Sequence, residues 1–139
     1  MNEHDHSHAA PPELTRNQAL VYGELSGSQN PLSAYTLLDR LRDRGMRAPL
    51  QVYRALDKLV DFGMVHRLES LNAFVACRHP DCETHRAVSF TICEKCGKVA
   101  EYADAGLTRH LETLARQSGF RLRQSTVELR GDCRECRDA

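Results

Sequence analysis

The stretch PLQVYRALDKLVDFGMVHRLESLNAFVAC, residues 49–77, changes its hydrophobic period half way along. Its first half carries an apolar stripe at helical spacing, formed by Val52, Leu56, Leu59 and Val60. Pro49 suits the first turn of a helix, and Gly63 is typical of the residue that ends one. From Met64 the period becomes two, which indicates strands. The stretch therefore predicts a helix that is followed at once by a β-hairpin.

The expected hairpin places Met64, His66 and Leu68 on one face. If residues 71–72 form its turn, His66 lies directly opposite Cys77 on the returning strand. Both side chains would then share the inward face of the hairpin.

Two further helices are predicted upstream of this stretch. The first carries the apolar repeat of residues 14–25, and the second has Ser33 as its N-cap and Gly45 as its stop. Three short helices and a hairpin follow one another in the order of a winged helix-turn-helix domain, which we expect over residues 13–78. Residues 1–12 are rich in histidine and end in two alanines and two prolines, so we expect a disordered tail there.

The second half of the chain is expected to be a small α+β unit. Residues 79–86 have neither period and indicate a hinge. The predicted elements after it are strands over 87–92, 98–103 and 121–129 and a helix over 107–119. A unit of this size, residues 87–139, has little core of its own and is expected to need a metal, a partner subunit, or both.

The composition suits a cytoplasmic protein with a modest core. The chain has 139 residues, 41% of them hydrophobic, and no apolar run long enough to span a bilayer. Its first residues lack the apolar stretch of a signal peptide. The net charge is zero, which by itself argues mildly against binding to nucleic acid, but six basic and two acidic side chains lie between Arg40 and Lys58.

Four of the six cysteines form two C-x-x-C pairs: Cys93 with Cys96, and Cys133 with Cys136. Two such pairs supply the four thiolates of a closed tetrahedral site, which suits structural zinc. The 36 residues between the pairs exceed the gap of a zinc ribbon, and the predicted strand, helix and strand account for the excess. A redox dithiol is the alternative for a lone pair, and the duplication favours metal.

A second set of possible ligands consists of His66, Cys77, His85 and Glu101. A metal held by these four residues would tie the hairpin, the hinge and the second unit together. From spacing alone, a packed core histidine and an ordinary small buried cysteine are the commoner explanation.

Four runs in this order resemble the ferric uptake regulator family: SAYTLL at 33–38, VYRALD at 52–57, VHRLESLN at 65–72 and CEKCG at 93–97. The resemblance covers residues 14–136 and is strongest to the zinc-responsive members. It implies a winged helix followed by a dimerisation domain with structural zinc on the four paired cysteines. It also implies a regulatory zinc on the second set, so that each subunit of a homodimer would hold two zinc ions.

The resemblance also bears on metal choice and on a further site. The soft thiolate of Cys77 favours zinc over iron or manganese. Some relatives carry an additional site near the hinge, and here His79, Cys82 and His110 are the nearby candidates, which we leave unassigned.

The predicted third helix has a face that could enter a major groove. Gln51, Arg54 and Lys58 lie at helical spacing, opposite the apolar stripe. The resemblance points to Arg54 as the base-reading residue and to a contact from the preceding helix. The expected DNA-contacting residues are Tyr35, Gln51, Tyr53, Arg54 and Lys58.

The sequence therefore predicts a zinc-responsive DNA-binding repressor with no small-molecule substrate and no membrane segment. An iron- or peroxide-responsive regulator of the same family is an alternative, against which Cys77 argues. A zinc enzyme is another, but four protein ligands leave no open position for catalysis. A zinc module that binds only proteins is the third, and the winged-helix order and the Arg54 face argue against it.

Overall fold

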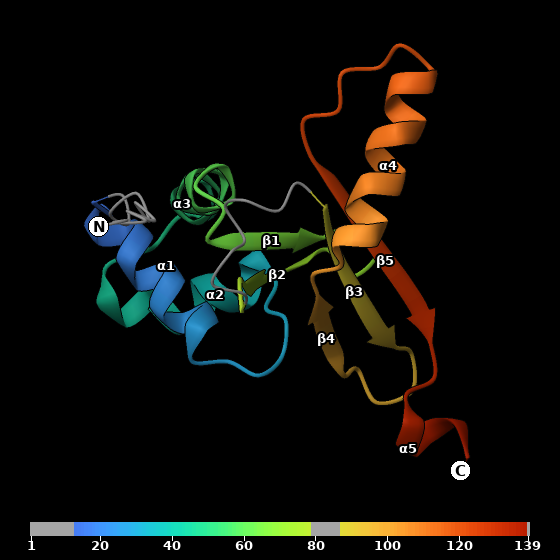
Figure 1. Cartoon of the computed structure of the whole chain (residues 1–139). Helices are drawn as coiled ribbons and strands as arrows, with labels where there is room; N and C mark the ends of the chain where they lie inside the picture. Colours follow the sequence, from blue (N-terminus) through green and yellow to red (C-terminus); the bar gives the residue numbers. More distant parts are fainter. Residues whose placement is uncertain (1–12, 79–86, 139) are drawn as a thin grey trace, which may run out of the picture.

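The computed structural model describes residues 13–78 and 87–138 (Figure 1). Its helices are α1 (Arg16–Ser26), α2 (Ala34–Leu41), the 3₁₀ turn η1 (Arg42–Arg44), α3 (Pro49–Asp61), α4 (Ala105–Gln117) and α5 (Arg134–Arg137). Its strands are β1 (Val65–Leu68), β2 (Ala73–Ala76), β3 (Ala87–Cys93), β4 (Val99–Tyr102) and β5 (Ser125–Gly131). The α+β class and the predicted order of elements are confirmed, while the expected tail and hinge lie outside the described residues.

The three N-terminal helices begin and end at residues that the sequence singles out. The Ser33 hydroxyl accepts the backbone N–H of Thr36 at the start of α2, and Pro49 occupies the first turn of α3. Gly45 and Gly63 have φ angles of +96° and +75°, a left-handed conformation that favours glycine and ends each helical segment. The buried faces of the helices meet in one core with Val65, Phe74 and Ala76 of the hairpin.

The hairpin register differs from the prediction. His66 pairs with Val75, and the N–H of Cys77 donates to the carbonyl of Met64, so Cys77 lies diagonally across from His66 and not opposite it. The loop has four residues, 69–72, because a two-residue turn at 71–72 would force Leu71 to positive φ, which costs energy for such a side chain. Asn72, which tolerates this conformation better, has the positive φ of 47°.

The second sheet has the strand order β4–β3–β5. Strand β3 pairs antiparallel with β4 and parallel with β5, and α4 lies in the crossover between β4 and β5. The predicted last strand was expected from Arg121, but β5 begins at Ser125, which pairs with Ala87 at the start of β3. Residues 121–124 alternate in sequence but belong to no strand, and the residues that would continue β3 beside them lie outside the described part of the chain.

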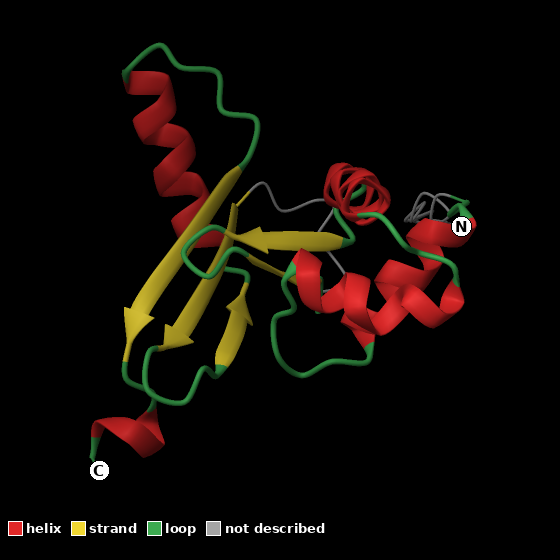
Figure 2. Ribbon diagram, turned by 180° about the vertical axis from the view of Figure 1, so that it is seen from behind, coloured by secondary structure: helices red, strands yellow, loops and turns green. Residues whose placement is uncertain are grey.

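The hairpin lies between the helices and the second sheet, with β1 crossing the direction of β3 (Figures 1 and 2). Leu68 lies outside the helical core and packs with Val88 and Phe90 of β3 in a second apolar cluster. Both faces of the hairpin are therefore buried, and the hairpin packs against both the helices and the second sheet. No helix within residues 13–78 or 87–138 has the length and apolar character needed to cross a membrane.

Candidate metal centres and nucleic-acid interface

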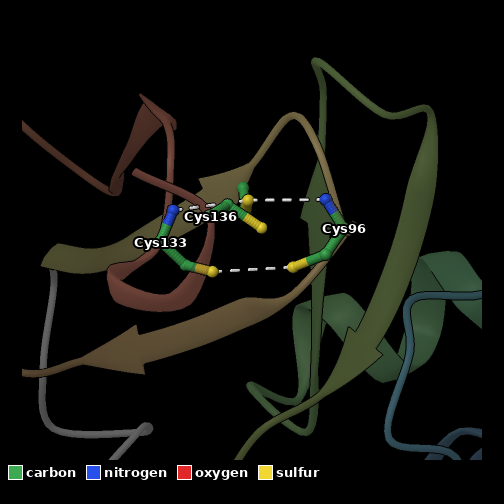
Figure 3. A group of neighbouring side chains, drawn as sticks. Cys96, Cys133 and Cys136 are labelled. Carbon is green, nitrogen blue, oxygen red and sulfur yellow. Dashed lines mark hydrogen bonds between the residues drawn. The ribbon is translucent and has the colours of Figure 1, made fainter. Parts of the chain in front are cut away.

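The four paired cysteines converge at one end of the second sheet, and Figure 3 labels three of them, Cys96, Cys133 and Cys136. Their sulfur atoms all lie within 4.8 Å of one another. Cys93 ends β3 and is the register partner of Gly131, the last residue of β5, so the parallel strands deliver both C-x-x-C turns to the same edge. The pairing of β3 with β5 therefore brings the two C-x-x-C pairs into a single cluster.

The electrostatics of this cluster suit a cation. The Cys93 sulfur accepts the backbone N–H groups of Cys133 and Cys96 at 3.3 and 3.4 Å, which lowers the pKa of Cys93 to about 6. Sharing of a proton with Cys133, together with burial, raises the pKa of Cys136 to about 12. The sulfurs of Cys96 and Cys133 are 3.7 Å apart. Four thiolates so close would repel one another, and a divalent cation is the partner that lets all four ionise.

A second cluster joins His66, Cys77 and Glu101, whose ligand atoms lie within 4.8 Å of one another. The Glu101 Oε1 atom is 3.6 Å from His66 Nε2 and 3.5 Å from Cys77 Sγ. His66 comes from β1, Cys77 directly follows β2, and Glu101 comes from β4, so the cluster spans the hairpin and the second sheet. Despite the register error, His66 and Cys77 share a face, because Cys77 lies two residues beyond the partner of His66.

Burial governs the protonation of His66. The side chains of His66 and Glu101 are each only 6% exposed. Burial lowers the pKa of His66 and outweighs the opposing effect of the Glu101 carboxylate. A neutral imidazole keeps a nitrogen lone pair for a metal, and the Phe90 ring packs edge-on against it with centroids 5.6 Å apart.

The two oxygens of Glu101 are used differently. Oε2 accepts the backbone N–H of Arg78 at 3.0 Å, while Oε1 faces His66 and Cys77. A backbone contact of this kind orients a ligating carboxylate. The Arg78 guanidinium in turn donates to the carbonyls of Ser26 and Ser28, at 3.2 and 2.5 Å, near the end of α1. The role of Arg78 has no local signal in the sequence, because its partners lie about 50 residues away.

The structure brings together three of the four residues expected in the second site. The fourth, His85, lies outside the described residues, as do His79 and Cys82. Cys77 is disulfide-bonded here, so a metal would require the reduced thiol. His110 is exposed on α4.

The expected DNA-contacting residues lie on α2 and α3. Tyr35 is 71% exposed, and Tyr53, Arg54 and Lys58 are also exposed, on the side of α3 away from its buried stripe. The side chain of Gln51 also makes contacts within the protein. Its side-chain oxygen turns back and accepts the backbone N–H groups of Arg47 and Ala48. These hydrogen bonds provide an acceptor for two backbone donors at the start of α3. Exposure leaves the other four available to a nucleic acid.

Comparison with known proteins gives consistent results. Residues 13–130 match the ferric uptake regulator family. The zinc uptake regulation protein of Escherichia coli K12 is 41% identical over 124 residues, which are 88% of this chain and 72% of that protein.

Two solved structures share the fold closely. A zinc uptake regulator complexed with zinc and DNA has a TM-score of 0.82 at 39% identity, with 91% of this chain and 84% of that one covered. The crystal structure of holo XcZur has a TM-score of 0.81 at 41% identity, with 91% and 88% covered. The family match spans most of the chain, and the expected metal ligands lie in clusters. This protein therefore belongs to the ferric uptake regulator family.

Proposed function

We propose that this protein is a zinc-responsive, DNA-binding transcriptional repressor that acts in the cytoplasm as a homodimer. Its targets would be genes for zinc uptake. The proposal is supported by the 41% identity to a zinc uptake regulation protein and by the likeness to a regulator complexed with zinc and DNA. It is a regulator and not an enzyme.

Two zinc ions per subunit are proposed. The first would be structural, on Cys93, Cys96, Cys133 and Cys136, where four protein ligands close the coordination shell. The second would be regulatory, on His66, Cys77, His85 and Glu101. A thiol beside imidazole and carboxylate favours zinc over iron or manganese, which speaks against the iron-responsive alternative.

The observation that carries the proposal is the position of the second cluster. His66 and Cys77 belong to the hairpin of the winged helix, and Glu101 belongs to the second sheet. Bound zinc would supply the charge that holds these groups together. His66 offers a neutral nitrogen, and the N–H of Arg78 keeps the Glu101 carboxylate oriented.

The proposed consequence is a fixed angle between the winged helix and the dimerisation unit. A dimer must present its two α3 helices at the spacing of a pseudo-palindromic site. Arg54 would donate to guanine, and Tyr35, Tyr53 and Lys58 would contact the duplex around it. We assign Gln51 a smaller part, since its oxygen already caps α3.

The test is a mobility-shift titration of operator DNA at buffered free zinc concentrations, with a reductant present. Wild type should bind more tightly with zinc, by about 5- to 150-fold for a typical allosteric coupling. Cys77→Ser should remain folded and lose most of that gain. His110→Ala is the matched control, because His110 is an exposed histidine on α4 that neither proposed site uses. Equal zinc responses of wild type and Cys77→Ser would refute the regulatory site.

A further inference from the structure

One row of side chains in the second sheet faces the hairpin along its length. Phe90 of β3 is the register partner of Glu101 on β4 and of Glu128 on β5. Register partners project from the same face of a sheet, so the three side chains form a row with a carboxylate at each end. Glu101 is the carboxylate of the second metal cluster, whereas Glu128 has no part in either proposed metal site.

Glu128 holds the loop at the tip of the hairpin. Its Oε2 accepts the N–H of Glu69 at 3.1 Å, and its Oε1 accepts the N–H and the hydroxyl of Ser70 at 3.2 and 2.6 Å. Glu128 thus receives three hydrogen bonds from residues 58 and 59 positions away in the sequence. Bonds to an ionised carboxylate are among the stronger hydrogen bonds in proteins.

The spacing of the two carboxylates matches the length of β1. Two strand-to-strand steps separate Glu101 from Glu128, about 10 Å in all. The three residue steps from His66 to Glu69 also extend about 10 Å along a strand. Strand β1 crosses the direction of β3 (Figure 2), so the row can hold β1 near both of its ends.

We propose that Glu128 is a positioning residue that anchors the tip of the wing independently of the metal. The inference rests on the proposed function for its effect on DNA. The metal cluster and the packing of Leu68 on Val88 and Phe90 hold the strands of the hairpin but do not hold its loop. The attachment of Glu69 and Ser70 to Glu128 fixes the loop and, with it, the direction of the winged helix.

The first test measures amide hydrogen exchange of the full-length protein. In Glu128→Ala, the amides of Glu69 and Ser70 should exchange about tenfold faster, the effect expected for loss of a charge-assisted hydrogen bond. The change should appear in the zinc-loaded protein and also in the Cys77→Ser background, which lacks the proposed regulatory ion but keeps the four-cysteine site. Glu128→Gln keeps one acceptor oxygen and should recover part of the protection. Unchanged exchange at both amides in Glu128→Ala would overturn the anchor.

The second test measures operator affinity at saturating zinc. Removing a negative charge near DNA would by itself tighten binding. The anchor predicts the opposite sign, with Glu128→Ala binding about tenfold more weakly at unchanged zinc content. Glu69→Gln is the matched control, because it removes a neighbouring charge and keeps the backbone N–H that Glu128 accepts. Unchanged or tighter binding by Glu128→Ala would overturn the positioning role.

A double substitution separates this contact from a general loss of stability. Ser70→Ala should weaken DNA binding in the wild-type background and have no further effect in Glu128→Ala, since the hydroxyl has then lost its acceptor. Additive losses would contradict the proposal. The exchange experiment uses no DNA, so it would still report on the anchor if the wild-type protein failed to bind an operator.

Discussion

The burial of His66 bears both on its proposed role as a metal ligand and on the pH dependence of the fold. Burial lowers its pKa below the ordinary value of 6.5, which keeps the imidazole neutral in the folded protein. In the unfolded chain the same residue takes up a proton at a higher pH. The metal-free fold should therefore keep its full stability above about pH 6.5 and lose stability as the pH falls below it.

This loss can be measured by urea unfolding of the chelator-treated protein at several pH values between about 7.5 and 5.5. His66→Phe removes the titrating group, so its free energy of unfolding should fall less over this range. Both proteins lack the metal of the four-cysteine cluster, so the difference isolates His66. Parallel pH profiles for the two proteins would show that burial does not govern this histidine.

The residues that the sequence could predict are those whose signal is local. The C-x-x-C spacing places two sulfurs together within one turn, and the structure then brings both pairs into one cluster. Arg78 and Glu128 act on backbone groups more than 45 residues away, and nothing in their neighbouring sequence marks them. The family resemblance, more than the pattern, singled out Glu101.

At the level of elements, periodicity predicted the type of each helix and strand better than their pairing. The helix boundaries followed from Ser33, Gly45, Pro49 and Gly63, because caps and stops depend on the backbone preferences of single residues. The hairpin register depended on the loop conformation, and the four-residue loop shifted it by two positions from the expected pairing. The shift kept His66 and Cys77 on one face, since side chains alternate with period two.

Helix α3 offers a prediction that separates base reading from phosphate contact. Arg54→Ala should cost about 1–3 kcal/mol of operator binding and relax specificity, because the bidentate donor to guanine is lost. Lys58→Ala should weaken binding to operator and unrelated DNA alike and reduce the salt slope by about one. Titrations of both DNAs at several salt concentrations measure these effects. A loss of discrimination by Lys58→Ala, with none by Arg54→Ala, would reverse the assignment.

For the molecule as a whole, the second unit, residues 87–138, has too small a hydrophobic core to be stable without a metal or a partner subunit. No residue of α4 is buried, although the helix is amphipathic. Large apolar side chains remain exposed on α4 and β5 and next to them: Tyr102, Leu114, Phe120 and Leu129. These features fit the proposed homodimer, in which a second copy would cover this surface while each zinc site stays within one subunit.

Leu129 tests that arrangement, because it is 57% exposed on β5 and projects from the face opposite Glu128. Leu129→Glu would place a charge in the subunit contact, where its desolvation is unfavourable, and should shift the protein to monomers in sedimentation velocity. Gln124→Glu, which adds the same charge just before β5, should leave the dimer intact. The Leu129→Glu monomer should retain its zinc, because the proposed ligands of each site belong to one chain. It should nevertheless lose tight binding to a pseudo-palindromic operator, since one recognition helix can occupy only one half-site at a time. A Leu129→Glu protein that stays dimeric would place the subunit contact elsewhere on the molecule.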